Sequence, residues 1–198
     1  MISKFHKFVA WNFAYNFFSS INSVLGTDSM LFMLHKTSEE TRTMNMTYNY
    51  VGKDIIGQFG GLLLSYYRRK RVDKNPISSA RKSVLFQQLA TGTDLCLRFV
   101  GTSWFLPLAG CSNVLKNVSW IGFGAFNNQR LYNFAKNQNI GELYTIFSIS
   151  NTLSSSIGML VGTSILPFLT FHHHRWILFG TLSCFQYFCF HQMTKIHV

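Results

Sequence analysis

Acidic residues are scarce in this chain. Only 7 of its 198 residues are Asp or Glu, against 18 Lys and Arg, which gives a formal net charge of +11. Acid–base catalysis needs carboxylates or histidines beside the reacting groups, and so few carboxylates leave few candidates. No Ser/His/Asp or Cys/His arrangement, no close pair of carboxylates and no zinc signature stands out. We therefore expect a protein that is not an enzyme and uses no cofactor.

Cysteine and histidine patterns that bind metals are also missing. The four cysteines form no CxxC motif and all lie in apolar stretches, where we expect them to act as small hydrophobic residues: Cys96, Cys111, Cys184 and Cys189. Three consecutive histidines precede Arg175. Neighbours on a helix point in different directions and cannot share one ion without a special loop. Residues 172–175 therefore predict an interfacial turn, and we expect no metal site.

Charged residues make up only 13% of the chain, about half the usual share. Residues 143–171 and 176–194 contain no Lys, Arg, Asp or Glu. A helix needs roughly 20 mostly apolar residues to cross a bilayer, so both runs predict membrane-spanning helices. Ser and Asn are frequent in the first run, and two core helices of a soluble helical protein are the alternative.

Six apolar segments can be drawn between polar stretches, at residues 8–34, 50–67, 83–106, 107–126, 143–168 and 176–194. Charge density predicts a loop over 68–82, and Asn and Gln predict another over 127–139. Pro107 predicts a break or kink between the third and fourth segments. The fold class that we expect is all-α: a polytopic membrane bundle of about six transmembrane helices, forming one membrane-embedded domain over residues 1–198.

The basic residues lie between the apolar segments. Nucleic-acid binders normally collect them on a face with few apolar runs, so we expect no nucleic-acid partner. With the N-terminus inside, twelve basic residues fall on inside segments and three on outside ones. This positive-inside bias predicts that the 68–82 loop lies on the inner side of a lipid bilayer.

Two pairs of glycines have the spacing that lets helices approach closely in lipid, namely Gly57 with Gly61 and Gly158 with Gly162. Gly60 adds a third glycine to the first pair. Because glycine weakens a helix, we interpret these five residues as helix-packing positions.

Ionisable side chains within apolar segments are costly and often mark functional sites. Lys53 and Asp54 lie at the start of the second segment, and snorkelling to the interface is the alternative interpretation. Asp94 and Arg98 are four residues apart and could pair on one helix face. Lys116 has no partner nearby in sequence and could meet Asp54 or Asp28, or line a polar cavity. We predict that these side chains form a polar path or ligand-binding site.

The sequence also resembles the Root UVB Sensitive family, described by its link to vitamin B6 photoprotection and homeostasis. Lys53-Asp54 with Gly57, Gly60 and Gly61 is similar to that family's Lys-Asp-Gly-x-Gly-x-x-Gly-type segment. Leu106-Pro107-Leu108-Ala109 with Asn113 and Lys116 resembles its Phe-Leu-Pro-Leu-Ala and Asn-x-x-Lys stretch, and 133–135 with 139–142 resembles a later motif. Asn75-Pro76 departs from the family's Asp-Pro. The resemblance adds Asn113 to the predicted polar path.

The resemblance implies an integral membrane protein of an intracellular organelle, a mitochondrion or the endoplasmic reticulum. We expect a transporter-like or scaffold role linked to vitamin B6 (pyridoxal phosphate) homeostasis, with an anionic, phosphate-bearing small molecule as ligand. An excess of buried cations over anions would suit that ligand. The alternative is a non-transporting assembly or tethering subunit, in a homo- or hetero-oligomer with a family member, whose glycine-rich faces would contact a partner protein. A third hypothesis, Schiff-base chemistry at Lys53, needs a water-accessible pocket.

Overall fold

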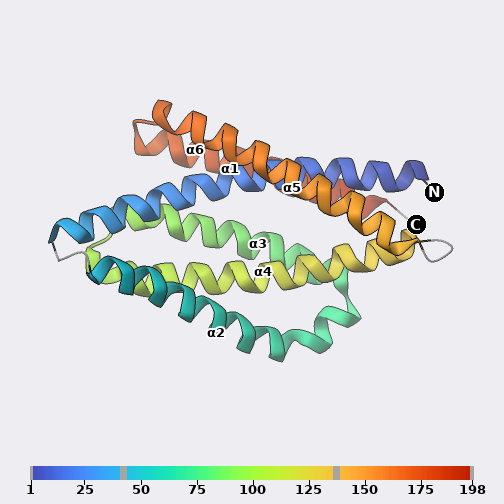
Figure 1. Cartoon of the computed structure of the whole chain (residues 1–198), viewed down its shortest axis with the longest axis horizontal. Coiled ribbons are helices and arrows are strands. Elements are labelled where there is room, and N and C mark those ends of the chain that lie inside the picture. The colour runs from blue at the N-terminus through green and yellow to red at the C-terminus, as the bar shows by residue number, and fades with distance from the viewer. Residues whose placement is uncertain (1, 41–43, 136–138, 197–198) are drawn as a thin grey trace. The chain divides into compact units, whose positions relative to one another are not determined.

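The computed structural model describes residues 2–40, 44–135 and 139–196. Six α-helices follow one another along the chain, with no strand in these ranges (Figure 1): α1 (Ile2–Glu40), α2 (Met44–Lys74), α3 (Pro76–Cys96), α4 (Phe105–Phe134), α5 (Ile140–Ile165) and α6 (His172–Lys195). Short 3-10 helices η1 (Leu97–Phe99), η2 (Thr102–Trp104) and η3 (Leu166–Phe168) lie between them. The prediction of an all-α chain with six helices is confirmed.

The predicted polar loops are mostly helical. Only Asn75 separates α2 from α3, so the loop predicted over 68–82 is wrong. Lys and Arg are good helix formers, and Pro76 occupies the first helical position, where its missing N–H costs nothing. The loop predicted over 127–139 is wrong as far as Phe134, where α4 ends.

Pro107 does not break a helix. It lies in the first turn of α4, which begins at Phe105, and a proline is tolerated there because those N–H groups have no intrahelical partner. The break lies earlier, at η1, Gly101 and η2. The three histidines likewise open α6 instead of forming a turn, and Arg175 Nε donates a hydrogen bond of 3.2 Å to the carbonyl of Leu169.

Within the described ranges, none of the helices combines the length and the apolar character needed to cross a bilayer. The prediction of about six membrane-spanning helices, with its positive-inside topology, is therefore not supported. The physical reason is that freedom from charge is not the same as apolarity. The run from 143 to 171 contains Ser148, Ser150, Asn151 and Ser154, which lower its hydropathy without adding a charge.

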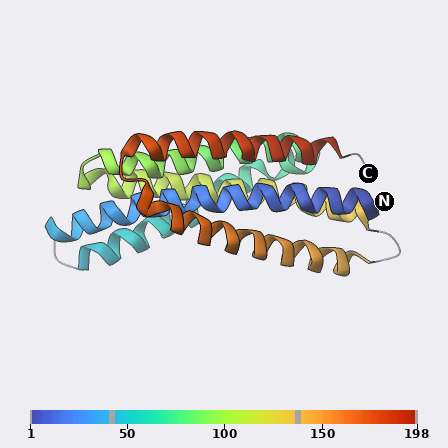
Figure 2. The same ribbon diagram turned by 90° about the horizontal axis from the view of Figure 1, so that it is seen from above.

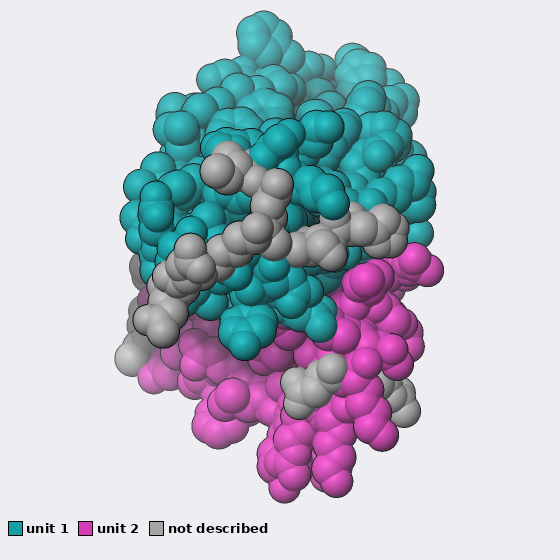
Figure 3. All heavy atoms as spheres, turned by 90° about the vertical axis from the view of Figure 1, so that its right-hand side faces the viewer, with its two compact units in different colours: residues 1–24, 126–198 teal, residues 25–125 magenta. Residues whose placement is uncertain are grey.

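The described residues divide into two compact units, coloured separately in Figure 3. Unit 1 comprises residues 1–24 and 126–198, and unit 2 comprises residues 25–125. The helices α1 and α4 contribute to both. One domain over residues 1–198 stays a prediction, because this division does not test it.

Aromatic side chains form the core of unit 1. Phe8 packs against Phe126, Phe134 and Phe147 with ring centroids 5.6 to 6.2 Å apart, and Phe126 also contacts Phe190. These rings belong to α1, α4, α5 and α6, and α1 runs alongside α5 and α6 in both ribbon views (Figures 1 and 2). Burial of such large apolar rings is the main stabilising contribution expected in this unit.

Several polar side chains of unit 1 form hydrogen bonds between its helices. The amide of Asn16 donates to Asn151 Oδ1 at 2.9 Å, and the amide of Asn22 donates to Gln186 Oε1 at 3.1 Å. Arg130, expected in an exposed loop, is buried in α4 and donates to the carbonyl of Ile196 at 2.9 Å. Burial lowers the pKa of its guanidinium.

The glycines of α5 permit a close approach to α1. A Cβ atom on Gly158 would lie 2.6 Å from the carbonyl oxygen of Phe17, and one on Gly162 would lie 3.1 Å from Val24 Cβ. Backbone oxygen cannot move aside as a flexible side chain can. Gly158 therefore lies against the α1 backbone at a distance that a larger residue does not allow.

We expect Gly158→Ala to lower the free energy of unfolding by about 1–3 kcal/mol, because its methyl group would overlap the Phe17 carbonyl. Gly180→Ala on α6 is the matched control. A Cβ there meets nothing within 4 Å, so alanine should raise the stability by about 0.5–1 kcal/mol. Urea denaturation of both variants measures the difference, and equal stabilities would contradict the close packing.

Candidate functional site: charged side chains of unit 2

A charged pair on α2 meets an amide of α4. Lys53 Nζ lies 2.6 Å from Asp54 Oδ1 and 4.0 Å from the centroid of the Tyr50 ring. The side-chain amide of Asn113 donates to the same Asp54 oxygen at 2.9 Å and to the backbone carbonyl of Lys53 at 3.3 Å. The Asp54 carboxylate thus accepts from both a cation and an amide.

A second pair joins α3 to α4. Lys116 Nζ lies 2.5 Å from Asp94 Oδ2, and the Asp94 side chain is only 2% exposed, whereas that of Lys116 is 31% exposed. Gly26 of α1 also approaches Asp94, because a Cβ on Gly26 would lie 3.1 Å from the same carboxylate oxygen. Asp94 is therefore enclosed by three helices, and its charge is balanced by Lys116, whose side chain is partly exposed.

The third pair joins Arg98 to Asp28, which the sequence suggested only as a possible partner of Lys116. Arg98 Nη2 lies 2.5 Å from Asp28 Oδ2, and Arg98 Nε donates to Ser29 Oγ at 3.2 Å. The guanidinium also lies 4.4 Å from the centroid of the Phe32 ring. Asp28 and Ser29 are on α1, so this pair fixes η1 to α1.

The pairing differs from the one expected. Asp94 and Arg98 do not pair, because α3 ends at Cys96 and Arg98 lies in η1, where the four-residue spacing no longer places both on one helix face. Lys116 meets Asp94 and not Asp54 or Asp28. The signal for Asp28 in the sequence was its place within a long apolar segment, because a carboxylate there needs a cation as partner.

The network is neutral. Three cations, Lys53, Arg98 and Lys116, each pair with one carboxylate. The expected excess of buried cations over anions is therefore absent from the paired side chains. An anion that binds at this network must displace a carboxylate from its cation or bring a positive charge of its own.

Glycines of α2 allow α2 and α4 to approach each other closely. A Cβ on Gly57 would lie 2.5 Å from Asn113 Nδ2, one on Gly60 would lie 2.6 Å from Val114 Cγ2, and one on Gly61 would lie 2.6 Å from Asn117 Cβ. The glycine faces therefore lie inside unit 2, and those of Gly158 and Gly162 lie inside unit 1. Side chains or backbone of this chain pack against each of these glycines, and the expectation that the glycine-rich faces contact a partner protein stays a prediction.

Cysteines and histidines build no site in the described part of the chain. Cys96, Cys111 and Cys184 are free and exposed, and Cys189 is free and buried, which raises the pKa of its thiol. The rings of His173 and His174 are 4.2 Å apart and edge to face. No group of three or more His, Cys, Asp or Glu side chains in the described ranges could hold a metal ion.

Comparison with known proteins identifies the family of this chain. Residues 2–197 match the model of the "Vitamin B6 photo-protection and homoeostasis domain". The chain belongs to this family. It is 26% identical over 171 residues to "Protein root UVB sensitive 4" of Arabidopsis thaliana, covering 85% of this chain and 32% of that protein.

It is also 25% identical over 178 residues to "Protein root UVB sensitive 6" of the same plant, covering 89% of this chain and 35% of that protein. The chain thus spans about a third of the length of these relatives. No solved structure matches it. The family predicted from the Lys53 and Lys116 motifs is confirmed.

The enclosed position of Asp94 predicts an asymmetric response to substitution. Lys116→Met should cost about 3–5 kcal/mol of unfolding free energy, because it leaves a buried carboxylate uncompensated. Asp94→Leu should cost less, since the Lys116 ammonium can reach solvent, and the double variant should recover part of the loss. Denaturant unfolding of the three variants measures this, with exposed Lys82→Met as the control. Strictly additive losses would contradict the pairing.

Proposed function

We propose that this chain acts in vitamin B6 homeostasis as a non-enzymatic, transporter-like binding module for a phosphate-bearing anion, with Lys116 as the group that meets the phosphate. The family link to vitamin B6 supports the general role. The observation that carries the site is the unequal exposure of the pair: the Lys116 side chain is 31% exposed, whereas that of Asp94 is 2% exposed.

Lys116 suits an incoming anion better than the other two cations of the network. The side chains of Lys53 and Arg98 are 8% and 10% exposed, against 31% for Lys116. Lys53 is in addition covered by Tyr50, and Arg98 by Phe32. A phosphate group approaching from solvent therefore meets the Lys116 side chain first, and to bind its ammonium it must displace the Asp94 carboxylate.

The neutral network sets a condition on this binding. A phosphate that takes the Lys116 ammonium leaves Asp94 as a buried carboxylate without a cation, and such a charge is strongly unfavourable. Proton uptake by Asp94 relieves it. Binding of the anion is therefore coupled to binding of about one proton, which is the type of coupling a transporter-like protein needs. The location at an organelle membrane stays a prediction.

Titration of the purified chain with pyridoxine 5′-phosphate tests the proposal, because this probe lacks the aldehyde that reacts with lysines. At pH 8 its phosphate is a dianion and brings no proton, so a proton taken up by the protein site on binding is supplied by the buffer. Calorimetry in two buffers of different ionisation enthalpy should show uptake of about one proton. Lys116→Gln should weaken binding by roughly 10- to 100-fold, the worth of a charge-assisted hydrogen bond.

Two controls define the outcomes. Lys82→Gln removes an exposed lysine of unit 2 and should leave the affinity unchanged. Asp94→Asn should keep the binding and abolish the proton uptake, because the amide has no proton to gain. Unchanged affinity in Lys116→Gln, or binding without proton uptake, would overturn the proposal.

A second candidate is an assembly subunit, favoured by two apolar stripes that the chain leaves exposed. Ile55, Phe59, Leu62 and Tyr66 follow one face of α2 at helical spacing, and residues 146–160 of α5 carry a similar stripe of Ile and Leu. Each stripe has the spacing of residues that dock on a partner helix. In this candidate a second family chain covers α2 on the face away from the glycines.

Phe59→Glu should lower the self-association of the purified chain if the α2 stripe is the interface, because a carboxylate would be buried against the partner. Sedimentation over a hundredfold range of protein concentration measures this. Trp120→Glu, an exposed aromatic of α4 in the same unit, is the control. A chain that stays monomeric throughout, or equal effects of the two variants, would exclude a homo-oligomer at this stripe.

A further inference from the structure

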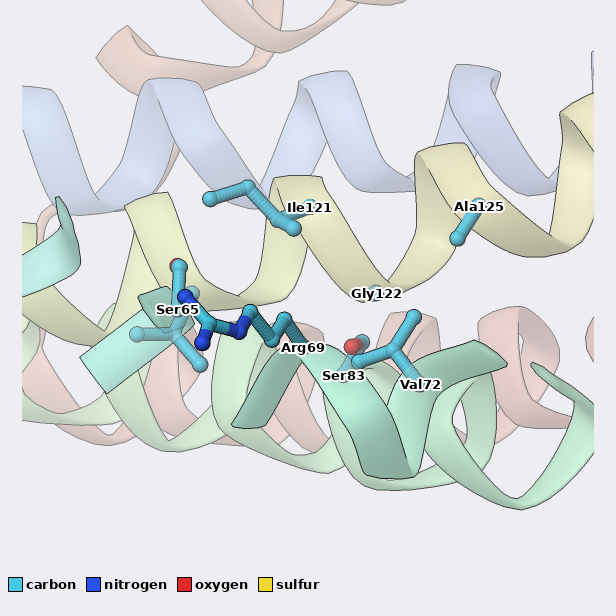
Figure 4. A pocket seen from close by; sticks show the side chains of 8 residues that line it. Ser65, Arg69, Val72, Ser83, Ile121, Gly122 and Ala125 are labelled. Carbon is cyan, nitrogen blue, oxygen red and sulfur yellow. The ribbon is translucent and has the colours of Figure 1, made fainter. Parts of the chain in front are cut away.

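A cavity of about 200 Å³ lies within unit 2, apart from the charged pairs (Figure 4). It is lined by residues of α2, α3 and α4: Ser65, Arg69, Val72, Ser83, Val118, Ile121, Gly122 and Ala125. Its volume equals that of about seven water molecules in the liquid. Drug-sized pockets are larger, so this cavity fits a ligand of roughly ten non-hydrogen atoms.

The walls of the cavity are apolar. Val72 approaches from α2, whereas Ile121 and Ala125 line it from α4, as Figure 4 shows. Water gains little in such a space because it finds few partners there. An apolar molecular body would bury its surface against these side chains at about 25 cal/mol per Å².

One buried hydroxyl in the cavity wall lacks a partner. Ser83 is 1% exposed, and its Oγ has no hydrogen-bond partner among the described residues. Its backbone carbonyl is already used, because it accepts from Ser119 Oγ at 2.7 Å. An unsatisfied buried hydroxyl costs about 1–3 kcal/mol, and a ligand oxygen at this point would recover part of that cost.

Among the described side chains, one cation lines the same cavity. The side chain of Arg69 runs along α2 from its backbone toward Ser65 (Figure 4), and its guanidinium lies 3.9 Å from the centroid of the Tyr66 ring. Arg69 is exposed, so the charged end is open to solvent. A guanidinium binds a carboxylate with two parallel hydrogen bonds, and one guanidinium matches the charge of one carboxylate.

We propose that this cavity is a binding site for a small apolar carboxylate, whose acid group meets Arg69, whose apolar body fills the space between α2 and α4, and which hydrogen-bonds Ser83 Oγ. A phosphate dianion fits less well, because one guanidinium does not balance it and the described side chains of the wall include no second cation. The site is separate from Lys116 and does not depend on the function proposed above.

The probe 3-phenylpropionate, with eleven non-hydrogen atoms, tests the site on the purified full chain. We expect saturable binding in a ligand-observed NMR titration and at least tenfold weaker binding of the neutral 3-phenylpropanamide. Arg69→Gln should remove the preference for the acid over the amide. Arg81→Gln, an exposed arginine outside the cavity, should leave it unchanged. An acid preference that survives in Arg69→Gln would overturn the assignment.

Two further variants test the cavity itself. Ser83→Ala should weaken the probe severalfold and leave the free chain as stable as before or more stable, because it removes the unpaired hydroxyl; exposed Ser78→Ala is its control. Ala125→Phe should occupy the cavity and abolish binding, with circular dichroism to verify folding. Wild-type affinity in both folded variants would show that the probe binds elsewhere and would overturn the proposal.

Discussion

The burial of one carboxylate constrains much of unit 2. Asp94 is almost completely enclosed, with Gly26 of α1 against it and Lys116 of α4 paired to it. A charge in such a position is tolerated only when a cation and the packing around it are held in place. The absence of a side chain at position 26 leaves room for the carboxylate, and hydroxyls of α4 hydrogen-bond to α3 carbonyls at Ala90 and Ser83. The contact between α3 and α4 is thus polar as well as apolar.

The helices were predictable, but their ends and their surroundings were not. The apolar segments drawn between polar stretches located all six helices. The polar stretches between them do not mark the helix ends, because Lys and Arg over 68–74 extend α2 almost to Pro76. Counting charges also overestimated apolarity, since Ser and Asn in α5 carry none. Hydropathy of complete helices is a different quantity from the absence of charge.

Site residues were found as individuals and not as partners. Lys53, Asp94, Arg98 and Lys116 stood out because a charge in an apolar helix needs a reason. Their pairing depends on where α3 ends. Because α3 ends at Cys96, Arg98 lies two residues beyond it in η1 and pairs with Asp28 of α1. The cavity beside Arg69 gave no signal at all in the sequence. Its described polar side chains are two serines and one arginine from two helices, and the packing of Gly122 against Ser83 brings α3 and α4 together at the wall.

The composition of the two units has a consequence for biosynthesis. Unit 2 is one continuous stretch, residues 25–125, whereas unit 1 joins the first 24 residues to residues 126–198. At about 5–20 residues per second, the ribosome needs several seconds to make the intervening stretch. Through that time the α1 residues that pack on α5 and α6, such as Phe8 and Phe17, have no native partner from those helices. The nascent chain must either fold from the middle outward or keep its N-terminal aromatic residues shielded by a chaperone.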